Sequence, residues 1–264
     1  MIAAWYARHG RHDLPWRATA DRWAVLVSEV MLQQTQVGRV AGVWPAFMAR
    51  FPTPEAMAAA SPGEVIAAWG TLGYPRRARR LWEAAGRVAA GEWPDDLSHL
   101  PGVGRYTAEA VAAQVDGRDA AAVETNVRRV VERRAGRRLS PREAAAASRE
   151  AGHPLTGRDR LLALMDVGAL LCRPRAPRCR ECPLEPGCAT GTLTAAGGPT
   201  AADASLGRRP RQSPYEGSFR QRRGRVLAAL RAGPQPAADL DAEALAALVE
   251  DGLAVLAGPT ARLP

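Results

Sequence analysis

The sequence predicts an all-α fold for residues 1–190, followed by a small appended module. Ala, Arg, Leu, Val and Glu dominate the long first part, and these are good or adequate helix formers. Apolar residues recur there at helical spacing, whereas the alternation typical of strands is scarce. Hydrophobic residues make up 47% of the 264-residue chain, which is enough for the core of one large domain or two modest ones.

The expected helices are separated by proline and glycine, which interrupt helical patterns. Apolar spacing predicts helices at 23–32, 54–60, 62–69, 76–90 and 107–114. The interrupting residues are Pro52, Gly70, Gly91, Pro94 and Gly117.

The last third of the chain has a different composition. Residues 191–214 are rich in Gly, Ala, Ser, Thr and Pro, which predicts a flexible linker. After it, SFRQRRGRVLAALRAG predicts a basic helix, and DAEALAALVEDGLAVLAGPTARLP predicts a second helix, a turn at Gly252 and a short hairpin. Residues 215–264 therefore fit a small winged-helix-like module, and a simple packing appendage is the alternative.

The charge of the chain favours a polyanionic partner. The net charge is +9, the sequence contains no lysine, and all 36 basic residues are arginine. Nucleic acid is the first candidate partner, although a genome that favours Arg codons would give the same bias. The chain contains no uninterrupted apolar run of about 18 residues and no signal-peptide pattern at its start, so we expect no membrane partner and a cytoplasmic protein.

All four cysteines lie in CRPRAPRCRECPLEPGC, with the spacing C-x6-C-x2-C-x5-C. Four thiolates this close together suit either a tetrahedral zinc ion or a [4Fe–4S] cluster, and spacing alone does not choose between them. Disulfides are the alternative, which the expected cytoplasmic location disfavours. The ligands would be Cys172, Cys179, Cys182 and Cys188. Four arginines between them give the loops a positive charge suited to phosphates.

The segment LPGVGRYTAEAVAA, at 100–113, predicts a tight turn that leads into a helix. Gly102 and Gly104 allow backbone N–H groups at the helix start to face outward, an arrangement that binds a phosphate oxygen. A lone GVG is weak evidence for such a site.

Together with the cysteine spacing, LPGVGRYTA resembles the helix-hairpin-helix glycosylases of the endonuclease III and MutY group. Further segments narrow the resemblance, which covers about residues 1–190, to MutY-type adenine DNA glycosylases: DLPWR (13–17), SEVMLQQTQV (28–37), TLGYPRRA (71–78, with Thr71 in place of a glycine), ETNVRRV (124–130) and LMDVGALLC (164–172).

The resemblance implies the helix-hairpin-helix DNA glycosylase fold. Residues 21–130 would form a six-helix barrel, and residues 1–20 and 131–190 a domain that holds a [4Fe–4S] cluster rather than zinc. The partner would be double-stranded DNA with a mismatched or damaged base pair, bound by a monomer in the bacterial nucleoid. Many members carry a Nudix-like domain that recognises 8-oxoguanine, and the residues after 190 are too few for it, so we expect a shortened form.

Hydrolysis of an N-glycosidic bond needs an acid for the departing base and a negative charge near the sugar. Glu29 has the apolar residues Val25, Leu26 and Leu32 nearby on its predicted helix. An apolar surround raises a carboxyl pKa, which suits a general acid, although a surface Glu is the common alternative. The resemblance implies that Glu29 protonates the purine at N7.

The second carboxylate departs from the family pattern D-x-N-V, because this sequence has Glu124 before Thr125, Asn126 and Val127. The resemblance gives Glu124 the charge-stabilising role and Asn126 the role of orienting Glu124 or a water. The longer side chain leaves three outcomes open: retained activity, weakened activity, or an altered substrate.

Tyr106 stands where bifunctional relatives carry a Schiff-base lysine. A phenol cannot form an imine, and no lysine is present elsewhere, so we expect a monofunctional glycosylase.

Base flipping needs a pocket for the base and side chains that fill the gap. The resemblance implies that Gln34 wedges into the duplex with help from Tyr74, and that Thr35 and Leu72 lie against the opposite base. Trp16, Tyr106 and Asp166 would line the adenine pocket, and Arg17 would bind the substrate or the DNA. Asp166 would accept from the adenine amino group. His12 stands where arginine is expected before DLPW, which puts one pocket contact in doubt.

The sequence therefore predicts a monofunctional glycosylase that removes adenine opposite 8-oxoguanine or guanine. Two alternatives stay open. Glu124 and His12 favour a related glycosylase with another target base, and the basic cluster and C-terminal modules would also suit a catalytically weak DNA-binding or regulatory protein.

Overall fold

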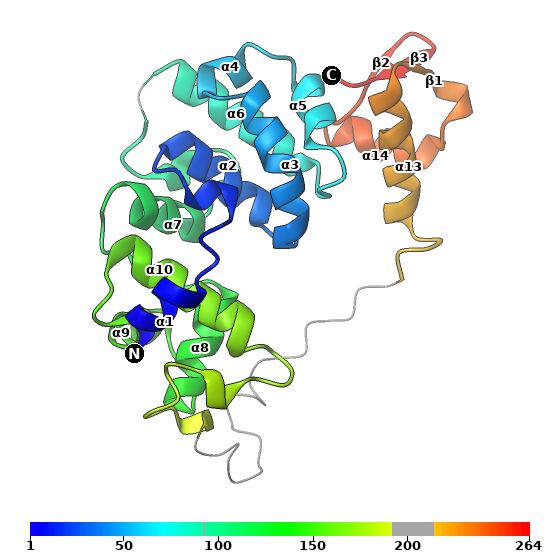
Figure 1. Ribbon diagram of the computed structural model, residues 1–264. Coiled ribbons are helices and arrows are strands. Elements are labelled where there is room, and N and C mark those ends of the chain that lie inside the picture. The colour runs from blue at the N-terminus through cyan, green and yellow to red at the C-terminus, as the bar shows by residue number, and fades with distance from the viewer. Residues whose placement is uncertain (92, 192–213) are drawn as a thin grey trace. The chain divides into compact units, whose positions relative to one another are not determined.

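The computed structural model of the chain describes residues 1–91, 93–191 and 214–264 (Figure 1). The predicted linker at 191–214 lies almost entirely outside the described residues. Contacts divide the chain into two compact units: unit 1 contains Met1–Val25 and Gly104–Arg209, and unit 2 contains Leu26–Val103 and Pro210–Pro264.

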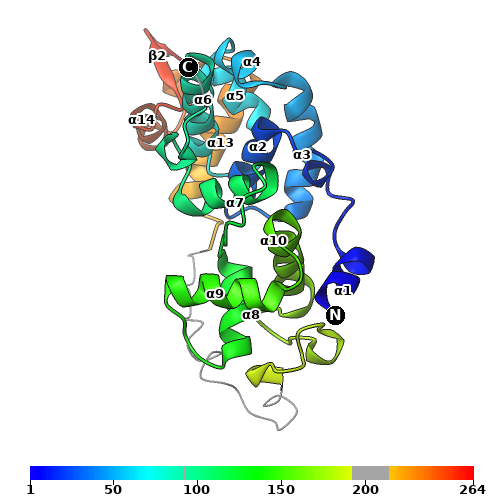
Figure 2. The same cartoon turned by 90° about the vertical axis from the view of Figure 1, so that its left-hand side faces the viewer.

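Unit 1 is helical in its described residues. Its elements are α1 (Ile2–His9), η1 (Pro15–Arg17), α7 (Arg105–Val115), α8 (Thr125–Ala135), α9 (Pro141–Gly152), α10 (Gly157–Asp166), η3 (Val167–Leu171) and η4 (Cys179–Glu181). The helices α8, α9 and α10 pack against one another (Figure 2). A serine–glutamate capping box, formed by Ser140 and Glu143, starts α9, and Gly136 in the left-handed region ends α8.

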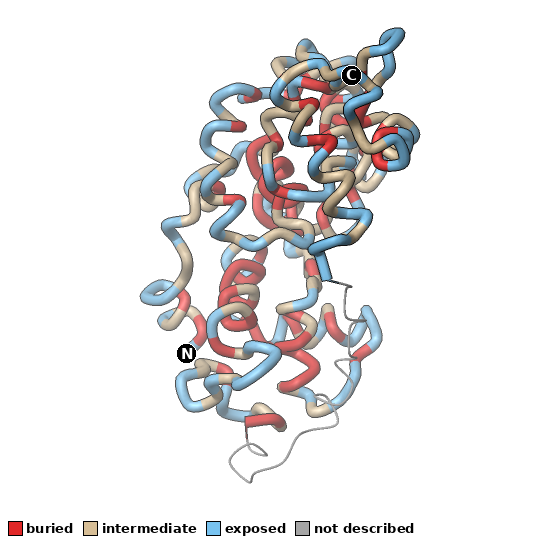
Figure 3. The backbone as a smooth tube through the Cα atoms, turned by 90° about the vertical axis from the view of Figure 1, so that its right-hand side faces the viewer, coloured by how far each residue is buried: buried red, intermediate tan, exposed pale blue. Residues whose placement is uncertain are grey.

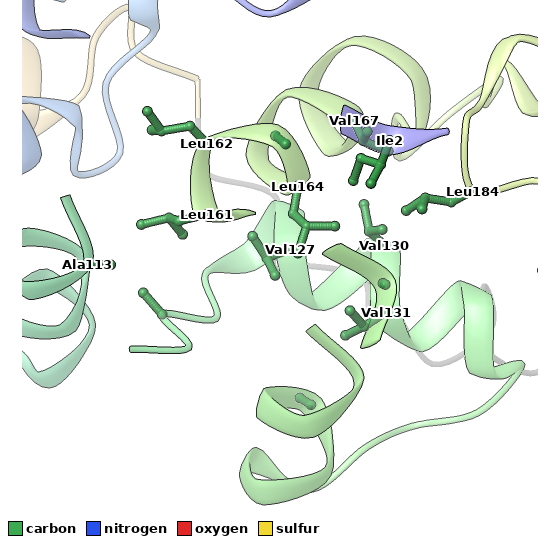
Figure 4. Close-up of a cluster of buried hydrophobic side chains, with 14 of the residues drawn as sticks. Ile2, Ala113, Val127, Val130, Val131, Leu161, Leu162, Leu164, Val167 and Leu184 are labelled. Atoms are coloured by element: carbon green, nitrogen blue, oxygen red, sulfur yellow. The ribbon is translucent and has the colours of Figure 1, made fainter. Parts of the chain in front are cut away.

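The core of unit 1 is built from helices that are far apart in the sequence. Val127 and Val130 of α8 and Leu161 and Leu164 of α10 belong to one buried cluster (Figure 4), and Ala113 of α7 belongs to the same cluster. Because α7 and α8 bury apolar residues there, they belong to the unit that also contains the four cysteines.

Unit 2 is built from two separate stretches of the chain, Leu26–Val103 and Pro210–Pro264. Its elements are α3 (Val37–Arg50), α4 (Pro54–Ala58), α5 (Pro62–Trp69), α6 (Arg76–Ala89), η2 (Leu97–His99), α13 (Phe219–Ala232), β1 (Gln235–Pro236), η5 (Ala237–Asp239), α14 (Ala242–Glu250), β2 (Val255–Ala257) and β3 (Thr260–Arg262). The helix α2 (Arg22–Leu32) crosses from unit 1 into unit 2.

The predicted helices are confirmed, because α2, α4, α5, α6 and α7 cover the five ranges with end shifts of one or two residues. The buried residues lie mainly along helices, while the connecting turns are mostly exposed (Figure 3). In the described parts of the chain, no helix has both the length and the apolar character needed to cross a membrane.

The C-terminal module contains the two helices, the turn at Gly252 and the hairpin that the sequence predicts, and it adds the short strand β1 and η5 between the helices. A helix is followed by a short strand, a second helix, a turn at Gly252 with φ 62° and the hairpin β2–β3. The three strands form an antiparallel sheet in the order β1-β3-β2, in which Ala261 pairs with Gln235 on one side and Leu256 on the other. This arrangement is winged-helix-like.

Asp251, at the end of α14, joins the module to α6 within unit 2. Its side chain is 3% exposed and forms ion pairs with Arg76 of α6 and Arg223 of α13. Arg79 of α6 donates to the Asp251 carbonyl oxygen at 3.0 Å. The module is therefore held to the first part of unit 2 by buried polar contacts.

Candidate functional site

The first group of predicted site residues surrounds a buried carboxylate in unit 1. Asp166, at the end of α10, is fully buried, and the neighbouring η1 supplies Trp16, which is 3% exposed. Arg17 donates from Nη1 and Nη2 to the two Asp166 oxygens at 2.6 and 2.8 Å. Arg11 adds its backbone N–H at 2.9 Å and Nε at 2.6 Å.

These arginines decide the protonation state of Asp166. Burial alone would raise its pKa, but the hydrogen bonds and charges of Arg17 and Arg11 outweigh burial and hold the pKa of Asp166 below its ordinary value. The carboxylate is therefore ionised at neutral pH, and both oxygens already accept hydrogen bonds from arginine. An adenine amino group could reach Asp166 only if one of these hydrogen bonds gave way.

His12 follows Arg11 but has a different partner. Its Nε2 is 2.8 Å from the carbonyl oxygen of Tyr6, and the two rings lie 4.8 Å apart between centroids. The resemblance places an arginine immediately before DLPW, where this chain has His12. The positive charge next to Asp166 comes instead from Arg11, one residue earlier.

The start of α8 holds the second group. Glu124 is the N-cap residue, and its Oε1 accepts from the Val127 N–H at 3.1 Å. The longer side chain therefore makes the capping contact expected of aspartate. Asn126 accepts at Oδ1 from Arg129 Nη2 at 2.7 Å, which fixes the amide toward the helix.

The segment η3 packs closely on this start of α8. Arg129 Nη2 also donates to the Gly168 carbonyl at 2.6 Å. A side chain at Gly168 would meet Asn126, because a Cβ there would lie 2.7 Å from the Asn126 Cβ. The glycine of LMDVGALLC thus allows η3 and α8 to approach each other.

The predicted hairpin has the expected geometry. Gly102 has φ 78°, in the left-handed region that favours glycine, and Gly104 is the N-cap of α7. Tyr106, in the first turn of α7, is partly buried against the core of unit 1. Gln33 Nε2 lies 3.5 Å from the Gly102 carbonyl oxygen, at the limit of a hydrogen bond.

The third group of predicted residues lies in unit 2. Glu29 of α2 is 5% exposed, and Gln34 and Tyr74 are exposed. Thr35 is half-buried, and its hydroxyl lies 3.4 Å from the Leu72 carbonyl. Leu72 is only 2% exposed, so its side chain faces the protein interior in this structure.

The four cysteines come together in unit 1. They line one cavity of about 30 Å³ with Arg133, and none of them forms a disulfide. Within the described residues, no three His, Cys, Asp or Glu side chains converge closely enough to hold a single metal ion. The shared cavity nevertheless gathers four sulfur atoms from a loop of 17 residues (172–188), the donor set that iron–sulfur clusters and zinc both use.

Two buried arginines of α8 hold the first cysteine in place. Arg129 Nε donates to the Cys172 carbonyl at 2.6 Å, and Arg133 Nη1 lies 3.5 Å from its Sγ. Burial raises the pKa of Cys172, while Arg133 and Arg129 act in the opposite direction. Burial also raises the pKa of Cys182 to about 11. Bare thiols at these positions would stay protonated at neutral pH, so a bound metal centre has to displace their protons.

Sequence reasoning missed Arg11, Arg129 and Arg133 as site residues. Arg11 carried a signal, because the position expected to be arginine lies beside it. Arg129 and Arg133 stand four residues apart among buried valines, so they share one face of α8. A pair of arginines on an otherwise apolar helix face predicts buried partners, here the carbonyl groups around Cys172 and Gly168.

Unit 1 contains the carboxylate that caps α8, the buried ion pair of Asp166 and the cavity with four thiols. Unit 2 contains the buried Glu29 and exposed polar and aromatic side chains. Carboxylates of this kind suit hydrolysis through a positively charged sugar transition state.

A family model matches residues 27–153, and its description is "HhH-GPD superfamily base excision DNA repair protein". Among curated proteins, the chain is 45% identical over 255 residues to an adenine DNA glycosylase from Mycobacterium tuberculosis (strain CDC 1551 / Oshkosh), covering 91% of this chain and 81% of that protein. It is 42% identical over 247 residues to an adenine DNA glycosylase from Mycolicibacterium smegmatis, covering 89% and 80%.

Among solved structures, the chain is similar to a thermostable thymine-DNA glycosylase. The TM-score is 0.64 and the sequence identity 29%, and the match covers 73% of this chain and 94% of that one.

Proposed function

Because this chain belongs to the adenine DNA glycosylase family of the HhH-GPD superfamily of base excision DNA repair proteins, we propose that it hydrolyses the N-glycosidic bond of adenine in double-stranded DNA. The proposed substrate is adenine opposite 8-oxoguanine or guanine. The proposed reaction is monofunctional, so water takes the place of the base and the DNA strand stays intact.

The observation that carries the proposal is the place of Glu124 at the N-cap of α8. The transition state is electron-poor at the sugar, and a fixed carboxylate stabilises it. The hydrogen bond from Val127 holds the Glu124 carboxylate where the aspartate of the family pattern would cap the helix. Asn126 lies two residues after Glu124, in the first turn of α8, where Arg129 holds its amide. It is proposed to orient Glu124 or the attacking water.

Glu29 is proposed as the acid that protonates the departing adenine at N7. Its side chain is buried on α2 among apolar residues that include Val25, Leu26 and Val30. A buried carboxyl group on a helix that faces the base would suit proton donation to a leaving group.

Tyr106 and the absence of lysine from the sequence support the monofunctional reaction. Formation of an imine at the abasic sugar needs an unprotonated amine, and a phenol cannot provide one. We expect no strand cleavage at a preformed abasic site and no product trapped by borohydride. Efficient trapping would contradict the monofunctional reaction without contradicting base removal.

The remaining predicted residues are proposed to bind the DNA. Gly102 and Gly104 would place backbone N–H groups of the α7 start at a phosphate. Gln34, Thr35, Leu72 and Tyr74 would contact the duplex at the opened base pair, and Trp16, Arg17, Tyr106 and Asp166 would line the base pocket. The buried position of Leu72 means that its contact with the opposite base requires local movement.

The four-thiol cavity is proposed to hold a [4Fe–4S] cluster through Cys172, Cys179, Cys182 and Cys188. The shared cavity fits this role, and Arg133 beside the Cys172 sulfur supplies positive charge to a thiolate set that carries negative charge. When bound, the cluster would tie the loop at 172–188 to α8. Arg173, Arg175, Arg178 and Arg180 are exposed on that loop and would face phosphates.

Iron and sulfide analysis of anaerobically purified protein tests the cluster. We expect about four irons per chain and a broad visible absorbance, which is lost when a chelator is added to unfolded protein. A colourless protein with one zinc per chain would contradict the cluster.

Single-turnover base excision tests the proposed reaction on duplexes with A:8-oxoguanine, A:G, T:G and U:G pairs. We expect adenine release from the first two. Glu29→Gln should slow release by about 10²- to 10⁴-fold, and Glu124→Gln by about 10²- to 10³-fold. Glu124→Asp should stay within about tenfold of the parent, because it keeps the charge and the cap. Glu150→Gln, on the exposed side of α9, is the matched control and should leave the rate unchanged.

Release of thymine or uracil alone would favour a second candidate, a mismatch glycosylase with another target base. The similarity to the solved thymine-DNA glycosylase is the observation that keeps this candidate open. Tight binding of all four duplexes without any excision would instead indicate a DNA-binding protein.

A further inference from the structure

Two turns of unit 2 hold residues in a backbone conformation that side chains disfavour. Gln34, just after α2, has φ 55°, and Tyr74, just before α6, has φ 48°. Neither is glycine, and both side chains are exposed, with Tyr74 48% exposed. Such strain persists only where the surroundings force it, and it concentrates at functional sites.

One side chain, Arg77 at the start of α6, links the two turns. Its Nη1 donates to the carbonyl oxygens of Val30 and Met31, at 2.8 and 3.0 Å, and to that of Gln33. These groups end α2, where a positive charge is favourable. The residue immediately before the strained Gln34 is therefore fixed by Arg77.

The other arm of the guanidinium reaches the residues that follow. Nη2 donates to the Thr35 hydroxyl oxygen at 2.9 Å and to the Gly73 carbonyl at 3.1 Å. Thr35 follows Gln34 and Gly73 precedes Tyr74, so Arg77 contacts Gln34's neighbours on both sides and the residue before Tyr74.

Aromatic packing completes the arrangement. The Arg77 Cζ lies 5.3 Å from the centroid of the Trp69 ring and 5.4 Å from that of the exposed Tyr74 ring. Trp69 is fully buried, and its Nε1 donates to the Gly73 carbonyl at 3.0 Å. A planar guanidinium can bind carbonyls in its plane and aromatic rings on its faces at once, which an ammonium cannot do.

Burial lowers the pKa of Arg77 to about 10, so the side chain stays charged at neutral pH. The Arg77 side chain is half-buried, and its Nε has no hydrogen-bond partner. The hydrogen bonds of Nη1 and Nη2 offset the cost of burying this charge.

We propose that Arg77 is a positioning residue that holds Gln34 and Tyr74 together as one preorganised element for opening the base pair. This inference rests on the proposed glycosylase function, because it assigns the two side chains to the duplex. In this proposal, Arg77 makes no contact with the base or with the reacting atoms. Its role is to keep both strained turns in place before DNA arrives, so that binding energy is not spent on ordering them.

The test uses the full chain with Arg77→Lys and Arg77→Met, and Arg87→Met as the matched control. Arg87 is an exposed arginine of the same helix, which donates to the His99 carbonyl. The first measurement is hydrogen exchange without DNA. We expect the amides at 33–35 and 73–74 to exchange at least about tenfold faster in both Arg77 variants and unchanged in the control.

The second measurement follows base opening without chemistry, by the fluorescence rise of 2-aminopurine placed at the target adenine. We expect a smaller and slower rise in both Arg77 variants, and single-turnover adenine release about 10- to 100-fold slower. Adenine opposite an abasic-site analogue, which has no partner base to unpair, should be released within about threefold of the parent rate. Arg77→Lys keeps the charge and should recover little, because it lacks the planar fork.

Exchange at the two turns that equals the parent's in both variants would overturn the proposal, as would unchanged fluorescence. An equal loss of release on the abasic-site duplex would also overturn it, since it would place the defect in the chemical step. If the parent protein raises the 2-aminopurine fluorescence but releases no adenine, the proposed function is contradicted and this inference is not. Arg77→Lys keeps the experiment decisive if Arg77→Met does not fold.

Discussion

Asp166 is held by two arginines that precede it by 155 and 149 residues. Its carboxylate is fully buried and ionised, and a buried charge of this kind is tolerated only while its partners remain. Together, Arg11 and Arg17 donate two hydrogen bonds to each of the two Asp166 oxygens. The ends of η1 and α10 are therefore held together by a buried ion-pair group.

Replacement of Asp166 by asparagine should lower the free energy of unfolding by about 3–5 kcal/mol at pH 7, because Arg17 would stay buried without its charge partner. The folded pKa of Asp166 lies below its ordinary value, so its stabilisation is present above about pH 4 and is lost as the pH falls below that value. Denaturant unfolding of parent and variant between pH 3 and 7 measures this difference.

The difference should be constant above about pH 5 and should shrink toward pH 3. Asp13→Asn, at an exposed position next to the same turn, is the control and should change little at any pH. A stability difference that grows as the pH falls would show that Asp166 is not the ionised partner of these arginines.

At the scale of single residues, the candidate site residues came from the resemblance, and their contacts could not be predicted from the sequence. Spacing gives local neighbours, whereas the partners of Asp166 come from the other end of unit 1. The same limit applies to Arg77, whose five acceptors come from two separate turns. The cap that Glu124 makes was not predicted either, because its longer side chain pointed to a poorer cap; in the structure it still accepts from the Val127 N–H three residues on.

Among the elements, η3 and the start of α8 depend on one glycine. Gly168→Ala would place a methyl group 2.7 Å from the Asn126 Cβ and 2.9 Å from its carbonyl oxygen. We expect a loss of about 1–3 kcal/mol of stability, together with slower base excision, because Asn126 and Glu124 would move with the helix start.

Denaturant unfolding and single-turnover excision measure the two effects. Gly86→Ala is the matched control, because Gly86 lies inside α6 and an added Cβ would meet nothing within 4 Å. The control should gain about 0.5–1 kcal/mol, since alanine is the better helix former. A Gly168→Ala protein as stable and active as the parent would mean that η3 can shift without cost.

The sequence predicted helices where apolar residues recur at regular helical spacing. It did not predict a helix where glycine and proline interrupt that spacing. The helices α5 and α6 match the ranges predicted from spacing, and α5 also carries the capping box of Ser61 and Glu64. In contrast, α3 was not predicted. It contains Gly38, Gly42 and Pro45, which weaken a helical pattern, and tertiary packing of Val40 and Phe47 outweighs that weakness.

Over the whole molecule, the C-terminal module is part of unit 2 and not a separate body. Besides the Asp251 contacts, the Gly63 N–H at the start of α5 donates to the Pro264 carbonyl at 2.7 Å. The exposed residues of α14 include Glu243 and Glu250, and no arginine lies on this helix. The module therefore lacks the basic second helix with which DNA-reading winged helices enter the major groove.

Asp251→Asn should lower the free energy of unfolding by about 1–3 kcal/mol, because Arg223 would lose its partner in a largely buried place. The Arg76 side chain is mostly exposed and adds less. Denaturant unfolding measures the effect, with Glu109→Gln as the control that breaks an exposed pair and should cost about 0–0.5 kcal/mol. Equal stability of the parent and the Asp251 variant would show that the module is held by other contacts.

The division into units also fixes an order of events during synthesis on the ribosome. Residues 26–103 form a continuous stretch that can collapse as soon as it emerges, because most of its partners are close in sequence. The first 25 residues leave the ribosome earlier but must wait for α10, whose Asp166 is their ion-pair partner. Until then Ile2 and Trp16, buried in the finished protein, remain apolar surface without their native partners, and we expect the nascent chain to be most prone to aggregation in this interval.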